Sequence, residues 1–184
     1  MKFIKTDIPE VFVIESTVYG DNRGYFFESF NQKEFEKHVG EINFVQDNES
    51  KSSKGVLRGL HFQKPPYSQA KLVRCIEGRV MDVAVDIRKG SSTYGKHVAV
   101  ELSGENKRQL FVPRGFAHGF SVLSENAVFA YKVDNTYAPA SDSGIRFNDE
   151  DLNIDWGLAA AEVQLSEKDK NLSFFKDLDS PFKF

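Results

Sequence analysis

Three residues of the chain carry side chains that could together move a proton next to a carbonyl group: His61, Lys71 and Tyr131. A histidine can act as a base near neutral pH, an ammonium group can stabilise a developing oxyanion, and a phenol can deliver a proton. Removal of a proton α to a ketone creates an enolate, whose oxygen needs a positive donor nearby. Inversion of the carbon also needs a second acid on the opposite face. These three residues can fill those roles.

Each of these residues also has an ordinary structural explanation. Taken alone, His61 is more often a hydrogen-bonded core histidine than a base, and Tyr131 could be a strand aromatic with a satisfied hydroxyl. Lys71 could extend its ammonium group to water along apolar walls. Asp169 stands three residues after Ser166, so its carboxylate could serve only to close a helix cap. The residue types leave these alternatives open.

Most of the sequence is typical of short β-strands separated by Gly, Pro, Asn and Ser. Residues 98–102 and 127–133 alternate with a period of two, which is the pattern of half-buried strands. In the second segment Phe129 and Tyr131 share one face, so Tyr131 should point wherever that apolar face points. The 17 phenylalanines suit the thick core of a barrel or sandwich.

Helix is predicted only in short pieces. Asn31 followed by Glu34 has the spacing of a capping box, which predicts a helix of about two turns over residues 32–39. Near the C-terminus, Ser166 and Asp169 predict one further helical turn.

The surroundings of His61 pose a geometric question. Arg58 and His61 are three residues apart and would face opposite sides of a straight strand. Both can reach one ligand only if Gly59 bends the chain. Just downstream, Pro65-Pro66 should force residues 63–69 out of the sheet, so that this loop could border a site.

Two segments resemble the metal-binding signatures of the cupin superfamily. Residues 113–120 match the second signature, and His61 matches the first. However, Gln63 stands where a second histidine ligand would be, and Lys71 aligns with the ligand glutamate. An ammonium group cannot ligate a divalent cation unless it loses its proton. The resemblance therefore implies a cupin barrel without a metal.

Six segments, two of which include these signatures, match one known family in order and over nearly the whole chain. They are Asp21–Glu28, Phe44–Asn48, Gly55–Gln63, Asp86–Lys96, Phe111–Ser124 and Leu165–Asp169. In these segments the chain resembles the dTDP-4-dehydrorhamnose 3,5-epimerase family. The resemblance implies an isomerase that needs no cofactor and converts dTDP-4-dehydro-6-deoxy-D-glucose to dTDP-4-dehydro-L-rhamnose by proton transfer α to the C4 ketone.

Carried over by matching positions, the resemblance makes His61 the base, held by Asp169. It makes Tyr131 the opposing acid and places Lys71 beside the developing oxyanion. It also implies a set of residues that bind the sugar, the diphosphate and the nucleoside: Arg23, Glu28, Gln46, Asn48, Arg58, His118, Asp142 and Lys168. Bidentate arginine suits the diphosphate.

Two of the binding positions and one neighbouring residue have alternatives or depart from the family pattern. His118 could simply hydrogen-bond the barrel wall, as a cupin-like histidine without metal partners would. Glu49 stands where the family commonly has histidine, and Asp142 stands where it usually has glutamate. Either departure could alter the nucleotide contacts without changing the proton chemistry.

Composition limits the partners. With 24 Lys and Arg against 27 Asp and Glu, the chain has no excess of basic charge, so nucleic acid is not an expected partner. A hydrophobic fraction of 40% and a charged fraction of 28% predict an ordinary protein without a membrane partner. Met1–Pro9 has no apolar run typical of a signal peptide, which predicts a cytoplasmic location. The single cysteine, Cys75, is predicted to be a buried structural thiol.

The sequence therefore predicts one domain over residues 1–184: a mainly β, cupin-type jelly-roll barrel with short peripheral helices and strand-rich extensions at both ends. One dTDP-sugar should bind in the barrel mouth, without metal or nicotinamide. The resemblance also implies a homodimer formed by exchange of N-terminal strands. The alternatives are a 3-epimerase or ketoisomerase of a related dTDP-4-keto-6-deoxy sugar, a metal-dependent cupin oxygenase, and a non-catalytic cupin that binds sugar nucleotides.

Overall fold

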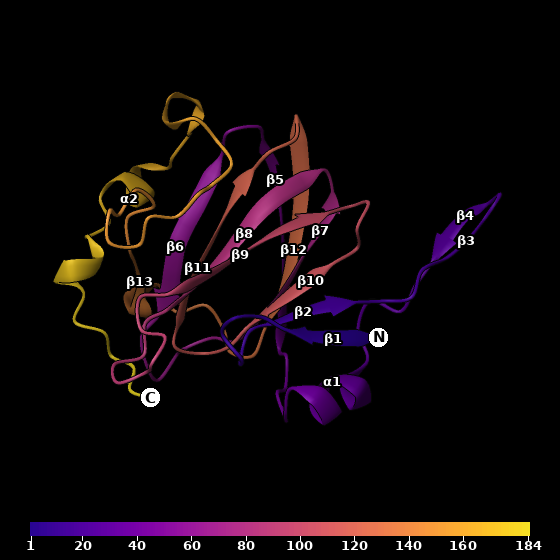
Figure 1. Cartoon of the computed structure of the whole chain (residues 1–184), viewed down its shortest axis with the longest axis horizontal. Coiled ribbons are helices and arrows are strands. Elements are labelled where there is room, and N and C mark those ends of the chain that lie inside the picture. The colour runs from indigo at the N-terminus through magenta and orange to yellow at the C-terminus, as the bar shows by residue number, and fades with distance from the viewer.

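Two antiparallel β-sheets form the body of the chain in the computed structural model, which describes residues 1–184 (Figure 1). The six-stranded sheet contains, in spatial order, β1 (Lys2–Lys5), β2 (Phe12–Glu15), β10 (Gln109–Val112), β7 (Lys71–Glu77), β12 (Asn126–Val133) and β5 (Gln46–Ser53). The five-stranded sheet contains β13 (Asp142–Gly144), β6 (Leu57–Gln63), β11 (Phe116–Val122), β8 (Arg79–Asp86) and β9 (His97–Ser103). The predicted mainly β class is confirmed, although the two sheets do not close into one hydrogen-bonded barrel.

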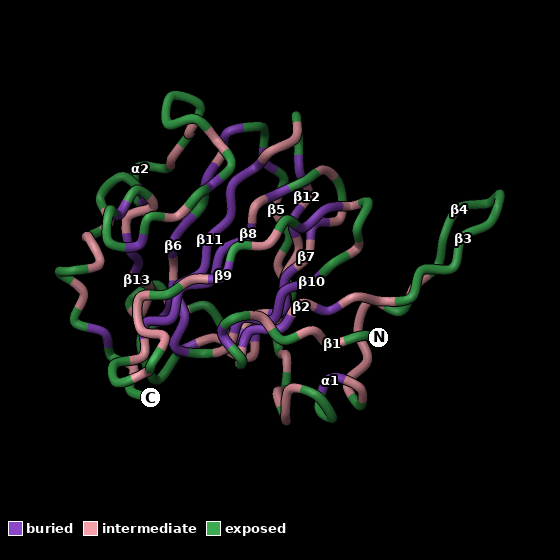
Figure 2. Tube along the Cα trace, viewed as in Figure 1, coloured by how far each residue is buried: buried purple, intermediate pink, exposed green.

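A separate hairpin of β3 (Tyr19–Asp21) and β4 (Gly24–Phe26) projects away from both sheets (Figure 1). Figure 2 shows this hairpin as exposed along its whole length. The strands predicted at residues 98–102 and 127–133 are present as β9 and β12, and Phe129 is buried on the inward face as expected.

The helices are short, as predicted. The first, α1 (Gln32–His38), begins at Asn31, whose side chain accepts a hydrogen bond from the Glu34 backbone. The second, α2 (Glu167–Lys170), begins at Ser166. Three 3₁₀ turns lie at Pro139–Ser141, Ala160–Glu162 and Phe175–Asp177. None of these helices has the length and apolar character that a membrane crossing requires.

Three apolar clusters cover the faces of the sheets. The largest lies between the two sheets and includes Phe120, Phe129 and the predicted buried thiol, Cys75. A second lies between the five-stranded sheet and the C-terminal segment, where Trp156 is buried. A third lies between the six-stranded sheet and α1, around Phe35. Each sheet therefore buries apolar side chains on both faces.

The prediction of a strand-rich C-terminal extension is wrong. Residues 145–184 contain no strand, only turns, short helices and three isolated bridges to the rest of the chain. The reason is their content of Asp and Asn, which favour turns. Asp149, for example, accepts hydrogen bonds from the backbones of Asp151, Leu152 and Phe175, so side-chain oxygens take the place of a strand ladder.

The bend expected in β6 is present at Gly59. This residue has φ of +131°, and the pairing of β6 with β11 changes register next to it. A Cβ atom at Gly59 would lie 2.6 Å from the Gly119 Cα, so no other residue fits without movement of the backbone. The bend allows Arg58 and His61 to line the same cavity.

We expect Gly59→Ala to lower the free energy of unfolding by about 3 kcal/mol or more, because it combines a disfavoured φ with a backbone clash. Gly40→Ala is the matched control, since Gly40 has φ of +119° but open space around it. The control should cost only about 1 kcal/mol. Urea denaturation of both variants measures the difference. Equal losses of stability would show that the close approach of Gly59 to Gly119 does not add to the cost.

Candidate active site

A cavity of about 400 Å³ opens between the two sheets and is closed on one side by α2 and β13. Eight of the twelve residues singled out from the sequence line it: Arg58, His61, Lys71, His118, Tyr131, Asp142, Lys168 and Asp169. The other four, Arg23, Glu28, Gln46 and Asn48, do not line it. Residues far apart in the sequence therefore meet at this cavity, and they come from strands of both sheets.

His61 and Asp169 are in direct contact across the junction of β6 and α2. His61 Nε2 lies 2.6 Å from Asp169 Oδ1. The cap role considered for Asp169 is present as well, because its backbone N–H donates to Ser166 Oγ and that hydroxyl donates to Asp169 Oδ2. Burial alone would raise the pKa of Asp169, but His61 and the Ser166 hydroxyl outweigh burial and hold this pKa below its ordinary value. Asp169 therefore stays ionised beside the imidazole.

The second ring nitrogen of His61 is free. Nδ1 is buried and has no hydrogen-bond partner within the chain, and the Asp142 carboxylate oxygen Oδ1 is 4.0 Å away. An imidazole whose one nitrogen faces a carboxylate and whose other nitrogen is free is arranged to accept a proton at the free position. The arrangement has the form of a histidine base oriented by an acidic residue.

Lys71 lies on β7, on the wall of the cavity formed by the six-stranded sheet. Its enclosure lowers the pKa of its ammonium group to about 8, despite the opposing attraction of Asp82 and Asp142. The charged form therefore still dominates at neutral pH, in surroundings that solvate it poorly. A cation of this kind stabilises a new negative charge on a ligand more strongly than one in water would.

Tyr131 stands on the same wall as Lys71, whereas His61 is part of the opposite sheet. No group of the chain makes a hydrogen bond to the Tyr131 hydroxyl. Burial raises the pKa of this phenol, so it carries its proton at neutral pH. The cavity thus has a candidate acid and a candidate base on opposite sides.

His118 forms a buried pair with Asp82 of β8. His118 Nε2 lies 3.0 Å from both carboxylate oxygens of Asp82, which is completely buried. Burial lowers the pKa of His118 even though Asp82 opposes this effect. His118 both bonds to the wall and lines the cavity, so the two interpretations of this residue are compatible in the fold.

The remaining charged groups lie toward the mouth of the cavity. Asp142 is held by two neighbours: the Tyr137 hydroxyl donates to its Oδ2 at 3.0 Å, and the Lys168 ammonium pairs with the same oxygen. The Arg58 guanidinium donates only to the Ser52 hydroxyl, at 3.2 and 3.3 Å, and contacts no carboxylate. Arg58 is therefore a cation available to an anionic ligand.

Gln46 and Asn48 lie on β5, next to the cavity wall rather than in it. Gln46 Nε2 donates to Asn48 Oδ1 at 2.8 Å, and Asn48 pairs with Tyr131 in the β5–β12 ladder. Asn48 and Tyr131 also border a second hollow, of about 290 Å³. Glu49, one of the two departures, lines that second hollow and not the main cavity.

Arg23 and Glu28 are the two predicted residues that lie farthest from this arrangement in the fold. Arg23 sits at the turn of the β3–β4 hairpin and pairs with Asp21. Glu28 follows the hairpin and accepts hydrogen bonds from the Asn31 side chain. Within one chain neither reaches the cavity.

The prediction from sequence missed three residues in or beside the cavity. Asp82 interrupts the apolar strand β8, and an acidic residue among buried strand residues is a signal that could have identified it. Gln63 was noted only as a missing metal ligand. Tyr137 lies in the loop after β12, where no periodic pattern marks it.

The residues at the cupin ligand positions do not fit a metal. Gln63 uses its amide oxygen and nitrogen in bonds to the backbone, His118 Nε2 faces Asp82, and Lys71 offers an ammonium group. The chain also brings together no group of three or more His, Cys, Asp or Glu side chains that could hold a metal ion.

Comparison with known proteins agrees with this geometry. The family model described as dTDP-4-dehydrorhamnose 3,5-epimerase matches residues 5–177. The dTDP-4-dehydrorhamnose 3,5-epimerase of Shigella flexneri is 57% identical over 180 residues, which cover 97% of this chain and 98% of that protein. The crystal structure of the enzyme of that name from Elizabethkingia anophelis has a TM-score of 0.92 at 58% identity, and covers 96% of this chain and 97% of that one.

A third relative has been solved with a sugar nucleotide. It is the dTDP-6-deoxy-D-glucose-3,5-epimerase of Legionella pneumophila in complex with dTDP-4-keto-L-rhamnose, with a TM-score of 0.95 at 50% identity and coverage of 100% of this chain and 98% of that one. The predicted cupin-type jelly-roll class is confirmed by these structures, since relatives this similar share one fold. The match over nearly the full length, together with the cavity between the sheets, shows that this chain belongs to the dTDP-4-dehydrorhamnose 3,5-epimerase family.

Proposed function

We propose that the cavity converts dTDP-4-dehydro-6-deoxy-D-glucose to dTDP-4-dehydro-L-rhamnose, with His61 as the base and Tyr131 as the acid. The observation that carries this assignment is their placement on opposite sheets across one cavity, with Lys71 beside Tyr131. Inversion of a carbon requires removal of a proton from one face and delivery to the other, and two facing walls meet that requirement. The chain is an isomerase of this family.

The reaction then consists of proton transfers only. His61 Nδ1 takes the proton from C3, and Asp169 stabilises the imidazolium that forms. The electrons of the C–H bond move into the enolate, whose oxygen is stabilised by the Lys71 ammonium. Tyr131 gives its proton to the opposite face of C3, and solvent returns a proton to Tyr131 and removes one from His61. The same cycle at C5 completes the conversion, because both carbons are α to the C4 ketone.

Binding of the nucleotide part is assigned to the charged mouth of the cavity. Arg58 has no carboxylate partner and can donate two parallel hydrogen bonds to a phosphate. Lys168 adds a second cation, while Asp142 and His118 are assigned to the sugar.

Two single substitutions should separate the base from the acid. His61→Asn should abolish deuterium entry from heavy water at both C3 and C5. Tyr131→Phe should still allow deuterium exchange catalysed by His61. It should reduce the rate at which the inverted product forms by about 10²-fold or more, because no acid remains on the opposite face of the carbon. Proton NMR of dTDP-4-keto-6-deoxyglucose without a reductase follows both quantities. Near-normal exchange in folded His61→Asn would overturn the assignment of the base.

The charge of Lys71 should appear in the pH profile. Because burial lowers the pKa of Lys71 to about 8, the cation is present below that pH and lost above it, so kcat/KM should fall as pH rises through about 8. Lys71→Met should reduce kcat by about 10²-fold or more and remove this alkaline limb. Circular dichroism checks that the variant is folded. An unchanged alkaline limb in Lys71→Met would show that another group titrates.

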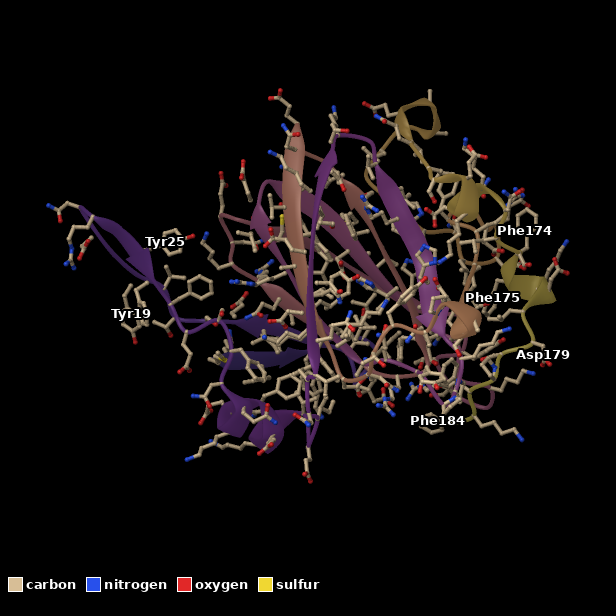
Figure 3. The ribbon with its side chains drawn as sticks, turned by 180° about the vertical axis from the view of Figure 1, so that it is seen from behind. Tyr19, Tyr25, Phe174, Phe175, Asp179 and Phe184 are labelled. Atoms are coloured by element: carbon tan, nitrogen blue, oxygen red, sulfur yellow. The ribbon has the colours of Figure 1, made fainter.

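We also propose a homodimer in which the β3–β4 hairpin of one chain completes the cavity of the other. The hairpin extends away from the sheets and carries Tyr19 and Tyr25 (Figure 3). Tyr19 is 66% exposed, Tyr25 59% and Phe26 71%. An isolated two-stranded hairpin is only marginally stable in water, so a surface that covers it is expected. The same proposal accounts for Arg23 and Glu28, which are assigned to substrate binding but lie away from the cavity of their own chain.

Complementation between two defective chains tests the shared site. Arg23→Ala and His61→Asn should each be nearly inactive alone. After the two are unfolded and refolded together, mixed dimers should contain one intact site and recover about a quarter of wild-type activity. Light scattering reports the mass of the assembly. A monomer, or no recovery on mixing, would contradict the proposal.

Two further predictions from the sequence belong here. We propose that residues 1–184 form one domain, because the C-terminal segment packs on the five-stranded sheet and supplies Asp169 to the cavity. The cytoplasmic location stays a prediction.

A further inference from the structure

Gln63, at the end of β6, is buried to 96% by its neighbours and uses its side-chain amide three times. Its Nε2 donates to the carbonyl oxygens of Tyr67, at 2.6 Å, and Thr136, at 3.1 Å. Its Oε1 accepts from the Ala138 backbone N–H at 2.6 Å. A buried amide with both ends bonded to backbone is a rigid link, because loss of it would leave polar groups unsatisfied.

Two of the three groups bonded to Gln63, the Thr136 carbonyl and the Ala138 N–H, belong to the peptide groups on either side of Tyr137. One amide thus fixes the backbone immediately before and after this tyrosine. The segment between β12 and the Pro139–Ser141 turn contains no strand or helix. The Gln69 and Asn135 amides also link this segment to the facing loop, but neither bonds to the peptide groups beside Tyr137. Gln63 also holds the loop with Pro65-Pro66, through Tyr67, and so joins the two loops at the rim.

Tyr137 is the part of this rim that a ligand can meet. Its side chain lines the cavity, more than half of the residue is exposed, and its hydroxyl donates to Asp142 at 3.0 Å. Because the hydroxyl is held at one end and the backbone at the other, the ring presents a fixed planar face at the mouth. A fixed aromatic face binds a ligand with less loss of side-chain entropy than a mobile one.

We propose that Gln63 is a positioning residue that holds the Tyr137 ring in place against the ligand in this cavity. Gln63 acts through the two peptide groups beside Tyr137 and takes no part in proton transfer. The identity of the ligand rests on the proposed function, whereas the mechanical link between Gln63 and Tyr137 does not. The glutamine that replaces a metal ligand of the cupin signature would thus have a separate task in this chain.

A double-mutant cycle with dTDP as the probe tests this link. Gln63→Met keeps the length of the side chain and removes all three hydrogen bonds, and we expect dTDP to bind about tenfold more weakly to it by calorimetry. In a Tyr137→Ala background the same substitution should change the affinity by less than about twofold, because the ring it positions is gone. KM should rise with the loss of affinity, while kcat should stay within about threefold of wild type.

The cycle distinguishes positioning from general structural support. An equal effect of Gln63→Met with and without the Tyr137 ring would overturn the proposal, as would a fall in kcat at unchanged KM. Gln164→Met is the matched control, since it removes an amide bond to the Lys54 carbonyl outside the cavity lining, and it should leave dTDP binding unchanged. If Gln63→Met does not fold, Gln63→Asn, which keeps the amide but is too short to reach both peptides, is measured in the same cycle. Wild-type protein that binds dTDP without epimerising its sugar would refute the proposed function and leave this test intact.

Discussion

The contact between His61 and Asp169 is the interaction on which the rest of the site depends. It joins the C-terminal segment to β6, so the imidazole can be oriented only after that segment has packed on the five-stranded sheet. A buried carboxylate is costly unless it is paired and hydrogen-bonded. Asp169 meets both conditions, because His61 lies on one oxygen and Ser166 donates to the other. The short helix α2 is thus both a capped turn and the support of the base.

The other charges of the cavity balance one another in a similar way. Asp82 faces His118 at the floor, and Asp142 sits between Lys168, Tyr137 and His61 at the mouth. Arg58 and Lys71 are the exceptions: Arg58 contacts no carboxylate, and Lys71 has no short ion pair and an enclosure that lowers its pKa. An enclosed cation with an incomplete set of partners is poised to stabilise new negative charge on a ligand. The cost of holding it is consistent with its use in catalysis rather than in folding.

Much of the fold and of the site could be predicted from local patterns. Alternation in residues 127–133 identified β12 and the inward face of Tyr131, and Asn31 marked the start of α1. The bend at Gly59 was required by the spacing of Arg58 and His61 and is present. The expected strand-rich C-terminal extension does not form, because side chains such as Asp149 and Asn171 bond to nearby backbone there and compete with a ladder.

The sequence by itself determined the family, the strand pattern and the types of side chain that proton transfer requires, because these are properties of single residues and of short, regular spacings. Only the tertiary structure decided which of those side chains meet. The placement of His61 and Tyr131 on opposite walls depends on how two sheets face each other, and the burial of Asp82 depends on what packs over β8. The side-chain amide of Gln63 bonds to the peptide groups on both sides of Tyr137, which lies more than 70 positions away in the sequence. No local sequence pattern carries information over that separation.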